Sequence, residues 1–157
     1  GVLYAGLMLT ARGIRVLEFN CRFGDPETQV VLPLLETDLL EIVDACVNGT
    51  LADLDIHWKN GAAVCVVMAS KGYPEKVKSG KSVTIGEFPE DMVCFHAGTK
   101  MQHEHIVTSG GRVLGLTAWA NNLEAAWNRV YSNIDRIAFE GMHYRKDIAH
   151  RALEGAK

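Results

Sequence analysis

The sequence has no long apolar run and no excess of basic residues. No stretch approaches the roughly 20 apolar residues that a membrane-spanning helix needs, so the pattern argues against a membrane protein. The formal net charge of −3 gives no positive field that would attract nucleic acid or an anionic membrane surface. The first residues lack the basic-then-apolar order of a signal peptide and read like an internal strand, so we expect a piece of a longer protein.

Paired cysteines are also absent, because the four cysteines are scattered and form no Cys-x-x-Cys motif. They are Cys21, Cys46, Cys65 and Cys94, each in apolar or strand-like sequence. This spacing argues against a zinc or disulfide framework and predicts buried, reduced thiols. A reducing, cytoplasmic location is the interpretation that fits best.

The common nucleotide-binding signatures are missing too: there is no Gly-x-Gly-x-x-Gly and no Walker motif. What remains is ordinary for a soluble globular protein, with 48% hydrophobic and 22% charged residues in 157. That length suits one compact domain or two small pieces.

Hydrophobic periodicity predicts an α+β fold. Two apolar runs, 3–10 and 14–20, predict a β-hairpin, and the spacing within 36–47 predicts a helix that stops at Asn48-Gly49. Further strands are expected at 62–69, 82–85, 93–96, 106–108 and 113–118, followed by an amphipathic helical stripe over 123–137 with a cap at Asn121-Asn122. A hairpin, a helix, several strands and a helix are typical of α+β rather than of alternating parallel units.

The run 16–29 is the most informative part of the chain. Glu18 and Asn20 are two residues apart, so on a strand they share one face, while Leu17 and Phe19 are expected to point into a core. A carboxylate beside an amide oxygen makes a hard-oxygen site suited to Mg²⁺ that carries substrate phosphates.

The residues after this strand strengthen the hypothesis. Arg22 could hold a phosphate or carboxylate with two donors, and Gly24 permits an unusual backbone conformation. Asp25-Pro26 is typical of a helix N-cap followed by proline at the first helical position, which would place Glu27 in the first turn. The plain alternative is an amphipathic strand that enters a capped helix with its charges solvated.

Other polar clusters are weaker. His103-Glu104-His105 falls between strands, where a hairpin tip is a better interpretation than a metal site. His96 is best read as a structural histidine. The glycine-containing segments 71–74 and 109–112 could approach a phosphate through their backbone, but plain β-turns are the favoured interpretation.

Several blocks resemble one enzyme family. The segment Arg-Phe-Gly-Asp-Pro-Glu-Thr-Gln at 22–29 is similar to the signature of the phosphoribosylamine–glycine ligases, or glycinamide ribonucleotide synthetases, of the ATP-grasp superfamily. Four later blocks, at 68–74, 96–99, 108–114 and 144–148, resemble the C-terminal blocks of the same family in the same order. The residues at 20–22 and 69–74 look most like those of the synthetase module of eukaryotic multifunctional purine enzymes.

The resemblance implies a fold and an activity. Residues 1–50 would be the C-terminal part of an ATP-grasp domain, and 51–157 a small strand-rich C-terminal domain. The family joins glycine to 5-phosphoribosylamine through a glycyl phosphate, converting ATP to ADP and phosphate in purine synthesis. Its substrates are small molecules, its partner is the remainder of the same polypeptide, and this chain alone would be inactive.

The resemblance also implies roles for individual residues. Glu18 and Asn20 match the metal positions and would hold Mg²⁺ or Mn²⁺ on ATP. Arg22 would stabilise the transferring phosphoryl group or orient the glycine carboxylate. Asp25 would contact a substrate amine or merely cap the helix.

The sequence departs from the family at several positions, and it is compatible with two other function classes. Glu75 and Ala149 stand where the family commonly has glycine, which puts loop details of the trailing part in doubt. Another ATP-grasp carboxylate–amine ligase would share Glu18, Asn20 and Arg22, and a noncatalytic binding piece would keep the fold without turnover.

Overall fold

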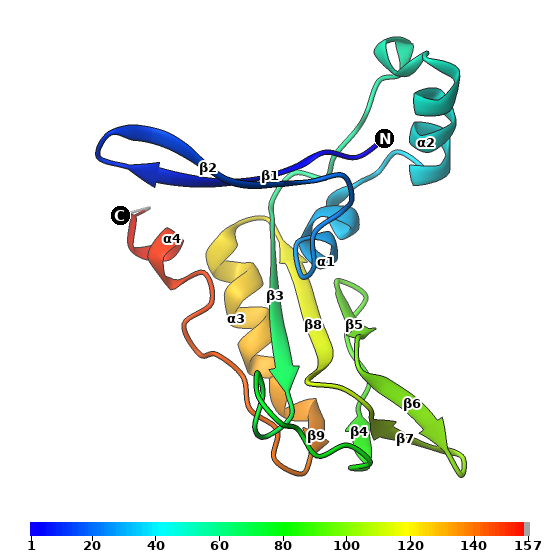
Figure 1. Ribbon diagram of the computed structural model, residues 1–157, viewed down its shortest axis with the longest axis vertical. Coiled ribbons are helices and arrows are strands. Elements are labelled where there is room, and N and C mark those ends of the chain that lie inside the picture. Colours follow the sequence, from blue (N-terminus) through cyan, green and yellow to red (C-terminus); the bar gives the residue numbers. More distant parts are fainter. Residues whose placement is uncertain (156–157) are drawn as a thin grey trace. The chain divides into compact units, whose positions relative to one another are not determined.

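The computed structural model describes residues 1–155, and the chain divides into two compact units, Gly1–Lys59 and Asn60–Lys157 (Figure 1). Each unit is α+β, as the periodicity predicted. Each is described by itself below.

The first unit opens with the predicted β-hairpin, made of β1 (Tyr4–Thr10) and β2 (Gly13–Asn20). Gly13 adopts a φ of +92° in the tight connection, a conformation that favours glycine. Residues paired across an antiparallel ladder lie on the same face, so the register defines two faces. One face is apolar and carries the pairs Ala5–Phe19, Leu7–Val16 and Leu9–Ile14, whereas the other carries Tyr4–Asn20, Gly6–Glu18 and Met8–Arg15.

The apolar side chains of this hairpin are exposed rather than buried. The large apolar residues Leu3, Leu7, Met8, Leu9, Ile14, Val16, Leu17 and Phe19 are between 48% and 82% exposed. The expectation that Leu17 and Phe19 point into a core is therefore wrong for this chain. A β-bulge between the pairs of Gly6 and Leu7 leaves Leu17 as the unpaired residue, and the described part of the first unit places no second layer over Phe19.

After the hairpin, the first unit is helical. It contains α1 (Thr28–Val31), the 3₁₀ turn η1 (Leu32–Leu34), α2 (Leu39–Asn48) and the 3₁₀ turn η2 (Leu51–Asp53). Asp38 caps α2 by accepting a hydrogen bond of 2.7 Å from the Leu40 amide, and Gly49 ends it with a φ of +73°. The predicted stop at Asn48-Gly49 is thus confirmed, although the helix begins three residues later than expected.

The helix predicted to begin at Pro26 is wrong. The Asp25–Pro26 peptide bond is cis, residues 25–27 form a turn, and α1 begins only at Thr28. The Thr28 amide and hydroxyl both donate to the Gly24 carbonyl, which closes this turn ahead of the helix. The N-cap residue is Glu27, without a side-chain capping bond, so Asp25 is not the cap.

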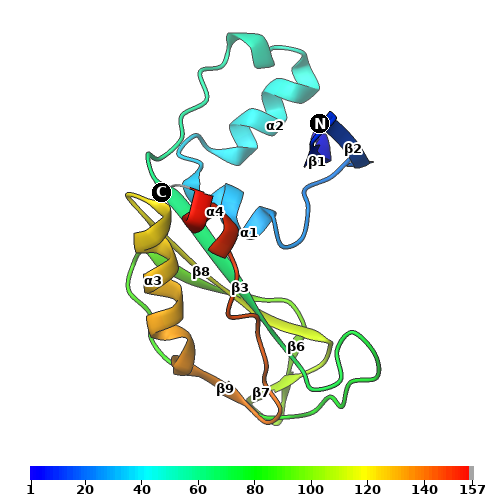
Figure 2. The same ribbon diagram turned by 90° about the vertical axis from the view of Figure 1, so that its left-hand side faces the viewer.

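The second unit is built on a three-stranded antiparallel sheet in the order β3 (Ala62–Ala69), β8 (Arg112–Ala120) and β5 (Met92–His96). Two small ladders accompany it: β4 (Val83–Ile85) pairs with β9 (Ile137–Phe139), and β6 (Thr99–Gln102) pairs with β7 (His105–Thr108). Helix α3 (Leu123–Asn133) runs along β3 and β8 (Figure 2), and the 3₁₀ turn η3 (Ile134–Arg136) and α4 (His150–Gly155) complete the unit. Strand β6 and helix α4 were not predicted.

The core of the second unit lies between the sheet and α3. Its sheet side comes from paired residues, such as Val66 opposite Leu116 and Met68 opposite Leu114, all fully buried. Its helix side comes from Ala126 and Val130, also fully buried. The apolar stripe after Asn122 is therefore core packing, as predicted. Asn122 caps α3, because its side-chain oxygen accepts a hydrogen bond of 2.8 Å from the Ala125 amide.

The far end of the predicted helical stripe is wrong, because Ile137 lies in β9 and not in a helix. The Arg136 carbonyl accepts from the Gly86 amide at 2.9 Å, and the Arg136 guanidinium donates to the Glu87 carbonyl at 2.7 Å. Pairing with β4 thus overrides the local helical period at this point.

All four cysteines are free thiols, but their burial differs from the expectation. Cys65 is buried, Cys46 and Cys94 are half-buried, and Cys21 is exposed, so the prediction of burial is wrong for Cys21. Burial raises the pKa of the Cys94 thiol to about 11, which makes this thiol unreactive.

Ala149 adopts a left-handed conformation that favours glycine. Its φ is +64°, and its carbonyl accepts from the amides of Ala152 and Leu153 at the start of α4. This conformation costs a non-glycine residue about 1–2 kcal/mol, whereas a new glycine adds about 0.4–1 kcal/mol of unfolded-chain entropy. This balance favours glycine over alanine at position 149.

Replacing Ala149 with glycine is therefore expected to raise the free energy of unfolding by about 0.5–1 kcal/mol, measured by urea denaturation. Ala152→Gly is the matched control, since Ala152 lies inside α4 and should lose up to about 1 kcal/mol. Equal losses in both variants would show that Ala149 is not strained.

Candidate functional site

The candidate site lies on the polar face of the β1–β2 hairpin. Glu18 and Asn20 share this face as predicted, and the Asn20 Nδ2 donates to the Glu18 Oε1 at 3.1 Å. Gly6 lies opposite Glu18, where a Cβ would come within 3.1 Å of the Glu18 Cγ. The glycine thus leaves room for the glutamate side chain.

Arg22 and Asp25 lie on the segment between the hairpin and α1. The Arg22 Nη1 donates to the Phe23 carbonyl at 2.9 Å, and the side chain is exposed. The Asp25 Oδ1 accepts from the Gln29 Nε2 at 2.8 Å. The structure therefore orders both residues locally: Arg22 lies two residues, and Asp25 five residues, after the end of β2.

Tyr4 is a site residue that the sequence did not reveal. It pairs with Asn20 in the ladder, and its hydroxyl donates to the Glu27 Oε1 at 3.2 Å. The hydrogen bond to Glu27, with the negative charges of Glu27 and Glu18, raises the pKa of the Tyr4 phenol. Its cross-strand position opposite Asn20 is the signal that could have indicated it.

The donor set of this face suits a divalent cation that is shared with phosphates. Glu18 supplies carboxylate oxygens and Asn20 an amide oxygen, which is the chemistry that Mg²⁺ prefers. Asn20 would have to turn its Oδ1, rather than its Nδ2, toward the cation. Among residues 1–155 no group of three His, Cys, Asp or Glu side chains is arranged to hold a metal, so the remaining ligands would have to come from phosphates and water.

The C-terminal blocks form a second cluster, at one end of the β3–β8–β5 sheet. The Arg112 Nε donates to the Tyr73 hydroxyl at 2.9 Å, and the guanidinium lies 6.0 Å from the centroid of that ring. A Cβ on Gly98 or Gly111 would collide with the Arg112 carbonyl or with the Tyr73 ring. These glycines are needed for close packing of the loops, which is the β-turn interpretation of the segments.

The two histidine segments have structural surroundings. The His96 Nδ1 lies 2.8 Å from the Thr99 Oγ1, as expected for a structural histidine. His103 and Glu104 occupy the turn between β6 and β7 with φ values of 47° and 65°, so the predicted hairpin tip is confirmed.

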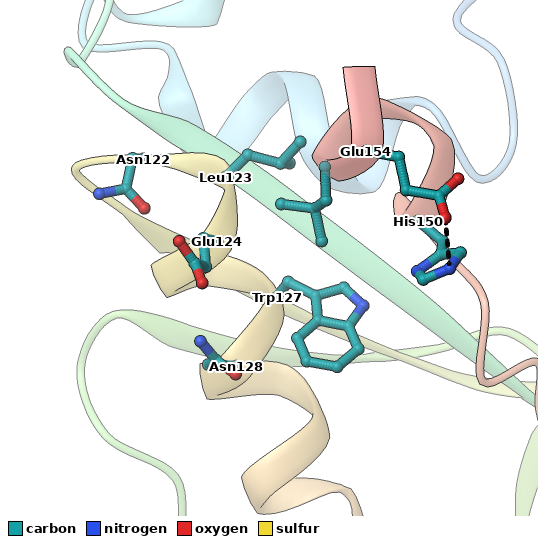
Figure 3. Close-up of a pocket in the computed structure, with 8 residues that line it drawn as sticks. Asn122, Leu123, Glu124, Trp127, Asn128, His150 and Glu154 are labelled. Atoms are coloured by element: carbon teal, nitrogen blue, oxygen red, sulfur yellow. Dashed lines mark ion pairs between the residues drawn. The ribbon is translucent and has the colours of Figure 1, made fainter. Parts of the chain in front are cut away.

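A separate pocket of about 430 Å³ lies between α3 and α4 (Figure 3). Its walls include Leu123, Trp127 and Leu153, and its edge carries Glu124 and an ion pair of 3.3 Å between His150 and Glu154. The lining contains two carboxylates and no lysine or arginine, so this pocket is poorly suited to a phosphate group.

Helices long and apolar enough to cross a membrane are absent from the described residues.

Two family models match the chain. The model described as "Phosphoribosylglycinamide synthetase, C domain" matches residues 63–151, and "Phosphoribosylglycinamide synthetase, ATP-grasp (A) domain" matches residues 1–28. The first covers more than half of the chain and lies in the second unit, and the other match lies in the first unit.

Similar proteins carry the corresponding names. The chain is 52% identical over 149 residues to the phosphoribosylamine–glycine ligase of Caldanaerobacter subterraneus, covering 95% of this chain and 36% of that protein. It is 48% identical over 158 residues to the human trifunctional purine biosynthetic protein adenosine-3, covering 98% of this chain and 15% of that protein. The chain is thus similar both to a single-function ligase and to part of a trifunctional enzyme.

A solved structure supports the same relationship. The crystal structure of phosphoribosylamine–glycine ligase from Thermotoga maritima matches with a TM-score of 0.74 at 35% identity, covering 94% of this chain and 36% of that one. The chain thus spans little more than a third of the single-function relatives it matches.

Proposed function

Because this chain belongs to the phosphoribosylglycinamide synthetase family, we propose that it supplies the metal-binding strand of a phosphoribosylamine–glycine ligase. In the proposed reaction, ATP phosphorylates the glycine carboxylate to glycyl phosphate with release of ADP. The amine of 5-phosphoribosylamine then attacks the acyl carbon, and phosphate leaves as glycinamide ribonucleotide forms. The observation that carries the proposal is the pair Glu18 and Asn20 on one hairpin face, next to the signature segment 22–29.

Glu18 and Asn20 would hold a divalent cation, Mg²⁺ or Mn²⁺, on the phosphates of ATP. When bound, the cation neutralises phosphate charge and so favours attack by the anionic carboxylate. Gly6 leaves the space that the Glu18 side chain occupies in this role.

Arg22 and Asp25 would act on the substrates. The Arg22 guanidinium donates to the Phe23 backbone carbonyl, which water can satisfy equally well. The side chain can therefore turn to the transferring phosphoryl group or to the glycine carboxylate. Asp25 does not cap α1, which supports the proposal that its carboxylate contacts a substrate amine.

We further propose that the domains divide as residues 1–50, the end of an ATP-grasp domain, and 51–157, the C-terminal domain. The matches to residues 1–28 and 63–151 support a boundary somewhere between residues 28 and 63. The rest of the same polypeptide would supply the missing walls of the site, and the free cysteines support a cytoplasmic location.

On this proposal the chain alone does not catalyse the reaction. It covers 36% of the Caldanaerobacter ligase, and the apolar face behind Glu18 and Asn20 is exposed. An isolated two-stranded hairpin is marginally stable in water, so the metal face needs a second layer to stay rigid.

The test uses a chimera in which this chain replaces the matching segment of the Caldanaerobacter ligase. We expect the chimera to release ADP over many turnovers only when glycine and 5-phosphoribosylamine are both present, and the 157-residue chain to release none. Dependence on a different acid or amine would favour another carboxylate–amine ligase. Binding of MgATP in isothermal titration without any turnover would favour a noncatalytic role.

A further inference from the structure

We propose that Tyr4 and Glu27 form a brace that positions the segment 22–27 against the strand carrying Glu18 and Asn20. The inference rests on the proposed function and deepens it, because Arg22 and Asp25 both lie on that segment. In this proposal Tyr4 and Glu27 are positioning residues, and neither touches the cation or a substrate.

The brace joins positions far apart in the sequence. Tyr4 is the first residue of β1 and lies opposite Asn20, the last residue of β2. Its hydroxyl donates a hydrogen bond of 3.2 Å to the Oε1 of Glu27, which lies 23 residues further along the chain. The contact therefore links the metal-binding end of the hairpin to the turn that follows it.

The other carboxylate oxygen of Glu27 lies against Gly24. The Glu27 Oε2 occupies the space where a Gly24 Cβ would lie. Gly24 is buried, unlike all other described residues of the first unit except Ala45. Gly24 thus serves to admit the Glu27 side chain, which lies between the glycine and the Tyr4 hydroxyl.

The turn around Glu27 is closed by its own hydrogen bonds, so it moves as one piece. The Thr28 amide donates 3.1 Å to the Gly24 carbonyl, and the Val30 and Val31 amides donate 3.1 Å and 3.0 Å to the Glu27 carbonyl. A local shift of Glu27 would therefore carry Asp25 with it. Displacements of about 1 Å in a catalytic arrangement can cost on the order of 100-fold in rate.

Glu27 could instead be a third ligand of the cation. The brace role and the ligand role predict different activities for the Glu27→Gln variant. A brace needs only a hydrogen-bond acceptor at position 27, which glutamine retains. A cation ligand at position 27 would also contribute its negative charge, which glutamine loses, so Glu27→Gln would then raise the half-saturating Mg²⁺ concentration.

In the chimera, Tyr4→Phe is expected to lower kcat roughly 10- to 100-fold, with the KM for ATP changed by less than about 3-fold because Glu18 and Asn20 stay in place. Glu27→Ala should have the same effect, and the double variant should be no worse than either single one, since both break one contact. Glu27→Gln should keep nearly full activity. Thr10→Val is the matched control, because it removes a hydroxyl from the same strand face at the far end of the hairpin.

Hydrogen exchange of the same chimera gives a readout that does not depend on activity. Tyr4→Phe should speed exchange of the amides of Thr28, Val30 and Val31 about 10-fold, and Thr10→Val should leave them unchanged. Unchanged exchange and unchanged kcat in Tyr4→Phe would overturn the brace, and Glu27→Gln as damaging as Glu27→Ala would make Glu27 a ligand instead. A chimera without any ligase activity would count against the proposed function, while its exchange pattern would still decide on the brace.

Discussion

Replacing Glu18 with alanine in the chimera is expected to lower turnover by about 1,000-fold or more. The carboxylate is the charged member of the proposed cation site, and its loss removes a contribution of several kcal/mol to stabilising the transferring phosphoryl group. The measurement is ADP release at saturating ATP, glycine and 5-phosphoribosylamine over a range of Mg²⁺ concentrations. The half-saturating Mg²⁺ concentration should rise together with the loss of rate.

Glu41→Ala is the control for this prediction, because Glu41 is an exposed carboxylate in the first turn of α2, outside the hairpin. Its loss should leave turnover within about 2-fold, since a charge at a helix terminus contributes only about 0.3–1 kcal/mol to stability. Turnover of Glu18→Ala near that of Glu41→Ala would remove the metal role from Glu18.

Leu116→Ala is expected to lower the free energy of unfolding of the chain by about 3–4 kcal/mol. Leu116 is fully buried in the central strand β8, between Val66 of β3 and Cys94 of β5. Truncating it leaves a cavity enclosed by neighbours on both sides, and close-packed interiors relax only in part. Urea denaturation followed by far-ultraviolet circular dichroism measures the change.

Thr117→Val is the matched comparison at the next position of the same strand. The Thr117 side chain is fully buried, points to the other face of the sheet, and its hydroxyl has no hydrogen-bond partner among the described residues. Replacing this hydroxyl with a methyl group should keep stability or raise it by about 1 kcal/mol. A cost below about 1 kcal/mol for Leu116→Ala would contradict the packing described here.

Local signals in the sequence predicted much of the fold. The strand at 62–69 lies where a continuous apolar run predicted it. The helix cap lies at Asn122, where a polar residue ahead of the apolar stripe predicted it. Such features depend on neighbours within a few residues, which is why a sequence pattern can specify them. Strand β6 was missed because Thr99–Gln102 has little apolar character and is ordered by pairing with β7.

The candidate site, too, was predicted only in part from the sequence. By itself, the sequence determined that Glu18 and Asn20 share a strand face and that a tight segment with Arg22 and Asp25 follows, because side chains alternate along a strand with a period of two. It could not determine that Leu17 and Phe19 are exposed, since alternation says which residues share a face but not what covers that face.

Only the tertiary structure placed Ile137 in a strand and brought the Tyr4 hydroxyl to Glu27. Both outcomes depend on partners more than 20 residues away in the sequence, at Thr84 and its neighbours for β9 and at position 27 for Tyr4. No local period encodes such a distance. The functional groups of the hairpin face and of the segment after it are thus specified by the fourteen consecutive residues 16–29. Their geometry depends on contacts that form only when the chain folds.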